Sequence, residues 1–71
     1  MNICIGGCWD GKKLLEEPEK GHFCVKHKTM SKLEVYERFV MPFKGSFYIF
    51  WVSKDLDRLE ALLKVKGYLK S

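Results

Sequence analysis

The sequence has no long hydrophobic run, and this absence limits where the protein can act. No stretch approaches the ~18 apolar residues of a membrane-spanning helix. The opening residues, MNICIGGC, lack the basic start and the apolar run of about 7–15 residues that a secretory signal peptide needs. We therefore expect a cytoplasmic protein that does not enter a membrane.

Several motifs that carry chemistry are also missing. The three cysteines are too few, and odd in number, for a disulfide framework, which favours reduced thiols. Gly6-Gly7 is not part of a G-x-x-x-x-G-K-[ST] phosphate loop, and no helix is expected to start after it. Two glycines at the end of a strand instead favour a tight corner that needs unusual backbone angles. No cofactor is expected.

The 71 residues can form one domain at most, here residues 1–71. A chain of this size buries only about 60% of its unfolded surface, which leaves little room for a deep active site. Aromatic residues make up 14% of the chain, so some of them should reach the surface, where an apolar patch usually marks a partner. A homodimer would cover such a patch.

The net charge of +4 comes from two segments, 12–32 and 54–71, in which lysine and arginine outnumber the acids. A positive net charge affects solubility and the electrostatic steering of partners, and it does not indicate a fold. Nucleic-acid binding is the functional alternative that it raises.

The strand predictions depend on β-branched and aromatic residues between turn signals. Asp10-Gly11 is a strong turn signal, and Pro42 should lie near a strand end or at a sheet edge. The last strand is apolar on both faces, which is typical of a central strand. Strands are expected over 2–5, 12–17, 22–28, 33–41 and 47–52.

A helix is expected after the last strand. Ser53 is a suitable N-cap, Asp55 is an acid in the first turn, and Gly67 is a suitable stop. The helical spacing predicts an apolar face made by Leu56, Leu59, Leu62 and Leu63. The fold class is therefore α+β, a small antiparallel sheet of four to five strands with one C-terminal helix packed on one face.

The cysteines and histidines allow a metal site or cysteine catalysis as alternatives. Cys4, Cys8, Cys24 and His27 are a legitimate zinc set, but their spacing is not that of paired knuckles. Cys8 beside two glycines could act as a nucleophile, although nothing places His22 or His27 near it. We favour Cys4 and Cys24 as small buried hydrophobic residues and Cys8 as a turn residue, so no metal site and no catalytic residue are expected.

Aromatic side chains are the best candidates for binding. A strand with Tyr48, Phe50 and Trp51, flanked by Lys44 and Lys54, could stack single-stranded nucleic acid, although it carries no RNP1-type pattern. An aromatic patch is also a suitable protein-docking surface. The candidate binding residues are Trp9, Tyr36, Tyr48, Trp51 and Tyr68.

Both ends of the chain resemble short, uncharacterised proteins of tailed bacteriophages and prophages. The matching segments are ICIGGCWDGKKL, YERF and FYIFWVSKDLDRLEALLKVKGY, whereas residues 17–32 match nothing in that group. The resemblance implies a sheet-plus-helix fold, a phage origin and action in the bacterial cytoplasm, and it brings no catalytic residues. We therefore expect a non-enzymatic accessory protein that binds a host or phage protein, with a small basic nucleic-acid-binding protein as the alternative.

Overall fold

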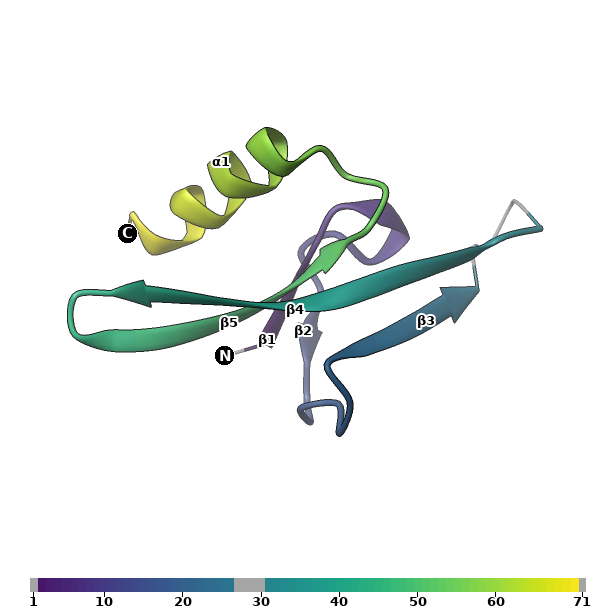
Figure 1. The fold of residues 1–71 in the computed structure, drawn as a ribbon, viewed down its shortest axis with the longest axis horizontal. Coiled ribbons are helices and arrows are strands. Elements are labelled where there is room, and N and C mark those ends of the chain that lie inside the picture. The colour runs from purple at the N-terminus through teal and green to yellow at the C-terminus, as the bar shows by residue number, and fades with distance from the viewer. Residues whose placement is uncertain (1, 27–30, 71) are drawn as a thin grey trace.

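The computed structural model describes residues 2–26 and 31–70 of the chain. Five strands form one sheet, and an α-helix after the last strand lies on one face of it (Figure 1). The predicted α+β class is confirmed. The elements are β1 (Asn2–Ile5), a 3-10 turn η1 (Gly7–Trp9), β2 (Lys13–Leu14), β3 (His22–Lys26), β4 (Leu33–Phe43), β5 (Ser46–Ser53) and α1 (Arg58–Leu69).

The strand order is β2-β1-β5-β4-β3, and one of the pairings differs from the antiparallel pattern. The pairs β1–β2, β3–β4 and β4–β5 are antiparallel, whereas β1 runs parallel to β5. The parallel pair joins segments more than forty residues apart, Asn2 with Ile49 through Ile5 with Val52. The predicted antiparallel sheet is therefore a mixed sheet. Parallel strands are not joined by a tight turn, so no local signal in the sequence could predict the β1–β5 pair.

The β4–β5 hairpin follows its turn signals closely. Lys44 and Gly45 have φ values of 49° and 79°, which suits the two-residue turn of a twisted hairpin. Pro42 lies near the end of β4, beyond the segment that pairs with β3, so its missing N–H costs no ladder hydrogen bond there. Both parts of the expectation for Pro42 are confirmed.

Strand β5 is central, as its two apolar faces predict. It lies between β1 and β4, and its adjacent residues Phe50 and Trp51 are both buried, on opposite faces. The helix-side core gathers Ile3, Ile5, Phe50 and Val65, and the core on the other face gathers Cys4, Val25, Tyr36 and Trp51.

The helix starts and ends later than predicted. Asp57, not Ser53, is the N-cap, and its carboxylate accepts a hydrogen bond from the N–H of Leu59 at 3.2 Å. Ser53 is the last residue of β5 and is buried. Gly67 lies inside α1 rather than after it.

The predicted apolar face of the helix is only partly correct. Leu56, which precedes α1, packs against the helix-side core, and Leu62 is partly buried. Ala61 and Val65 are the buried residues of α1, whereas Leu59 and Leu63 are 70% and 69% exposed. Apolar residues surround more than half of this helix, so periodicity alone could not decide which stripe packs on the sheet.

Four predicted strands have different lengths in the structure. β4 (Leu33–Phe43) and β5 (Ser46–Ser53) are longer than the predicted 33–41 and 47–52, and two strands are shorter. β2 is limited to Lys13–Leu14, and Leu15 is completely exposed. β3 ends at Lys26, and residues 27 and 28 of the predicted strand lie outside the described residues.

Candidate functional site

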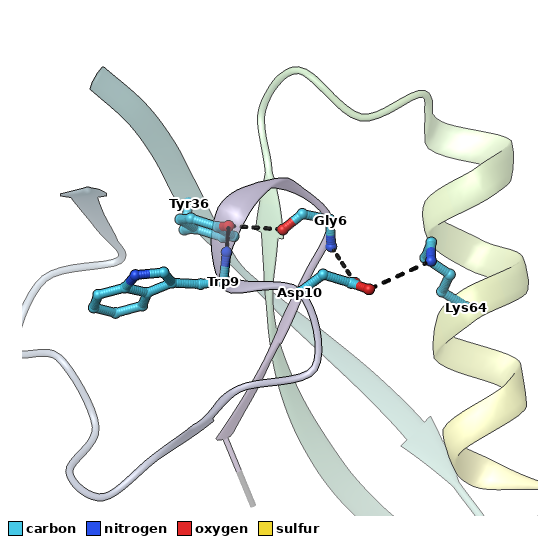
Figure 2. Close-up of polar contacts among 5 residues, drawn as sticks. All are labelled: Gly6, Trp9, Asp10, Tyr36 and Lys64. Carbon is cyan, nitrogen blue, oxygen red and sulfur yellow. Dashed lines mark hydrogen bonds and ion pairs between the residues drawn. The ribbon is translucent and has the colours of Figure 1, made fainter. Parts of the chain in front are cut away.

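The Gly-Gly corner is held by hydrogen bonds from β4. The Tyr36 hydroxyl donates to the carbonyl oxygen of Gly6 at 2.7 Å and accepts from the N–H of Trp9 at 3.0 Å (Figure 2). Gly6 and Gly7 have φ values of 80° and 67°, so both occupy the region that favours glycine. The stretch CIGGCWDGKKL is therefore a built corner between β1 and β2.

Two carboxylates complete the support of this corner. Asp10 accepts from the N–H of Gly6 at 2.7 Å and lies 3.6 Å from the Lys64 ammonium of α1 (Figure 2). The buried Glu34 accepts from the N–H of Cys8 at 3.1 Å. The Asp10–Lys64 ion pair is almost half exposed and adds little stability, so the backbone hydrogen bonds hold the corner.

The five candidate binding aromatics are not gathered on one surface. Tyr36 and Trp51 have no exposed surface, and a buried side chain cannot contact a partner or a base unless the protein opens, so we assign both to the core. Trp9 is half-buried on the same face, where its ring centroid lies 5.7 Å from that of Phe23. Only Tyr48 and Tyr68 contact the helix-side core, Tyr68 through Phe50.

The alternative metal ligands are also separated. Cys4 is buried in the core of the far face, as predicted, and Cys8 is exposed in η1. The prediction that Cys24 is buried is wrong, because in β3 it shares the exposed face of His22 and Lys26. His27 lies outside the described residues. Within 2–26 and 31–70, no three side chains of histidine, cysteine, aspartate or glutamate form a group that could hold a metal ion.

Two buried acidic groups should make the fold sensitive to alkaline pH. Burial raises the pKa of the Cys4 thiol from 9.0 to about 11 and that of the Tyr36 hydroxyl from 10.0 to about 12. Because the folded-state pKa values lie above the unfolded ones, the stabilisation is complete below pH 9 and is lost as the pH rises through 9–12. We expect the free energy of unfolding, measured by urea titration, to fall by roughly 2 kcal/mol or more in this range.

Cys4→Ala is the control for this prediction. Only Tyr36 then titrates with a raised pKa, so the decline should start about one pH unit higher. A stability that stays constant to pH 11 in the unmodified protein would contradict the assignment.

An open groove lies between α1 and β4. It consists of two hollows of about 450 and 400 Å³, which share no lining residue but follow one another along β4, at Phe39 and at Met41. One is lined by Met41, Phe43, Leu63, Lys66, Gly67, Leu69 and Lys70, and the other by Phe39, Val52, Arg58, Ala61, Leu62 and Val65. We call these together the α1–β4 groove.

The groove exists because the one helix covers only part of its face of the five-stranded sheet. Phe39, Met41 and Phe43 alternate along β4 on the helix side, and all three are only partly buried. Leu63 adds an exposed apolar side chain from the helix. The groove thus has an apolar floor and an apolar wall.

The ends of the groove are basic. Arg58 lies at one end and Lys66 and Lys70 at the other, and the described residues that line it include no acid. Sequence reasoning missed this site, since it searched for aromatic rings of tyrosine and tryptophan. The available signal was the period-2 run of apolar residues at 39, 41 and 43, together with a helix that has more leucines than one buried stripe needs.

The comparisons with known proteins give no further guide to this site. No protein-family model, curated protein sequence or solved structure matches the chain. Within the described ranges, no helix combines the length and the apolar character that a membrane crossing requires.

Proposed function

We propose that this protein is a small, non-enzymatic binding module that holds a segment of another protein in the α1–β4 groove. The observation that carries the proposal is the groove itself, which leaves Met41 and Phe43 partly exposed and Leu63 69% exposed between a helix and a strand. An exposed apolar hollow that is rimmed by charged side chains is a suitable docking place for a segment of another protein. The resemblance of both chain ends to phage proteins extends the proposal to a host or phage partner in the bacterial cytoplasm.

The remainder of the structure is consistent with a binding role. The Cys4 thiol is buried and its raised pKa keeps it protonated at neutral pH, so Cys4 does not suit a nucleophile. Cys8, the nucleophile considered from the sequence, is exposed in η1. Phe50 and Trp51, two of the aromatics considered for stacking on nucleic acid, are 3% and 0% exposed. Of the three aromatics considered for stacking, only Tyr48 is partly exposed, so a nucleic-acid partner would be held mainly by charge, and the experiment must separate this alternative.

The test is an affinity pull-down from bacterial lysate with tagged protein, with and without nuclease. We expect a protein partner that survives nuclease, is retained by Leu15→Glu and is lost with Leu63→Glu. Both leucines are largely exposed, so either change should preserve the fold, but only Leu63 lines the groove. Capture that disappears with nuclease, or that Leu63→Glu leaves unchanged, would overturn the proposal.

A further inference from the structure

We infer that the α1–β4 groove takes an amphipathic helix whose flanking residues are acidic. The inference rests on the proposed function and specifies its partner. It follows from the direction of the groove, the spacing of its floor and the sign of its charge.

The groove runs along α1 for most of the length of the helix. Its first hollow joins Phe39 to the early part of α1, and its second joins Met41 and Phe43 to the part from Leu63 to Lys70. From the first hollow to the second, the residue numbers rise along both β4 and α1, so the strand and the helix run in the same direction on the two sides of the groove. The 12 residues of α1 span about 18 Å, so a second helix of about three turns can lie beside it on the same face of the sheet.

The floor has the spacing of one face of a helix. Phe39, Met41 and Phe43 lie on the same side of β4, about 6.6 Å apart along the strand. Apolar residues at positions i, i+4 and i+8 of a helix are about 6 Å apart along its axis. Three such anchors can therefore pack against these three side chains, as in the recognition of amphipathic helices by apolar grooves.

The positive charge of the groove favours an acidic helix over a second copy of this chain. Arg58, Lys66 and Lys70 line it, without an acid among the described lining residues. Beyond Arg58 a third hollow adds Arg38 and Lys54 against a single acid, Glu37. A second copy of this chain would bring the same cations to the same ends, whereas a helix flanked by glutamate or aspartate would complement them.

The test uses two synthetic peptides of about 14 residues with the same leucines at i, i+4 and i+8. One carries glutamate at the flanking positions and the other lysine, and binding is measured by fluorescence anisotropy at low salt. We expect the glutamate peptide to bind about tenfold more tightly. The variant Lys66→Glu/Lys70→Glu should reverse this preference, whereas Lys13→Glu/Lys20→Glu, with the same change in net charge outside the groove, should keep it.

Different failures have different meanings. Equal binding of both peptides would overturn the acidic partner. If neither peptide binds although capture from lysate depends on Leu63, the helical partner is wrong while the proposed function holds. If sedimentation shows a dimer that Leu63→Glu dissociates, the occupant is a second copy. Binding to vesicles of phosphatidylcholine and phosphatidylglycerol that Lys66→Glu/Lys70→Glu abolishes would assign the groove to lipid and overturn both proposals.

Discussion

Replacing Trp51 by alanine should lower the free energy of unfolding by about 3–5 kcal/mol. The ring has no exposed surface, its centroid lies 5.4 Å from that of Phe23, and its indole N–H donates to the Asn2 side chain at 2.9 Å. The change would leave a large cavity on the central strand β5 and would remove that hydrogen bond. At about 0.05–0.15 kcal/mol per residue, a chain of 71 residues has only roughly 4–10 kcal/mol in total.

Urea unfolding followed by circular dichroism measures this effect, and Trp9→Ala is the matched control. Trp9→Ala removes the same atoms, but Trp9 is only half-buried at the edge of the same core. The free energy of unfolding should therefore fall clearly less than in Trp51→Ala. If Trp9→Ala proves the more destabilising of the two, the corner and not the central strand dominates this core. A loss below about 1 kcal/mol for Trp9 would instead indicate a ring available to a partner.

Replacing Gly7 by alanine should destabilise the protein by about 3 kcal/mol or more. A Cβ atom at this position would collide with the Glu34 carboxylate and would approach the Tyr36 hydroxyl within 2.5 Å. Its φ of 67° adds about 1–2 kcal/mol of strain for any residue with a Cβ. Relieving the collision would also disturb the hydrogen bonds that these two groups accept from Cys8 and Trp9, at about 1–3 kcal/mol for each bond lost.

Gly45→Ala separates the collision from the strain. Gly45 has a φ of 79°, but a Cβ there would meet nothing within 4 Å, so only the strain of about 1–2 kcal/mol should appear. Thermal unfolding of the two variants, compared with the unmodified protein, measures the difference. Equal effects at the two glycines would mean that β4 does not hold the corner tightly.

The binding proposal can be tested separately from stability. Trp51 and Gly7 do not line the α1–β4 groove, whereas Leu63 lines it and is mostly exposed. Leu63→Glu should therefore affect capture of a partner while the urea midpoint stays close to that of the unmodified protein. We expect stability and the proposed binding to depend on different residues, because the cores are closed and the groove is open.

The strands could be read from the sequence because their signals are local. Alternating apolar residues mark 22–26, β-branched and aromatic residues mark 33–41, and the turn at 44–45 joins the hairpin. The double-sided apolar segment 47–52 identified the central strand, since both of its faces must be covered. The role of Gly6-Gly7 as a corner was also accessible, because two adjacent glycines at a strand end favour unusual backbone angles.

The candidate site could not be predicted in the same way. Tyr36 and Trp51 were attractive anchors by residue type, but burial is decided by what lies across the sheet from them. Met41 and Leu63 line the same hollow because α1 packs on the sheet beside β4. The position of the helix on the sheet cannot be predicted from residue spacing along the chain. The predicted N-cap, Ser53, is likewise wrong, because Ser53 is the last residue of β5 and is buried there, and Asp57 caps the helix instead.

By itself, the sequence determined the α+β class, the strand positions, the hairpin and the tight corner at the two glycines. Each depends on neighbours within a few residues, whose backbone preferences and apolar periodicity act locally. Only the tertiary structure decided the parallel β1–β5 pair, the buried stripe of α1 and the groove beside it. These depend on contacts between distant segments, where several arrangements satisfy the same pattern and close packing selects one.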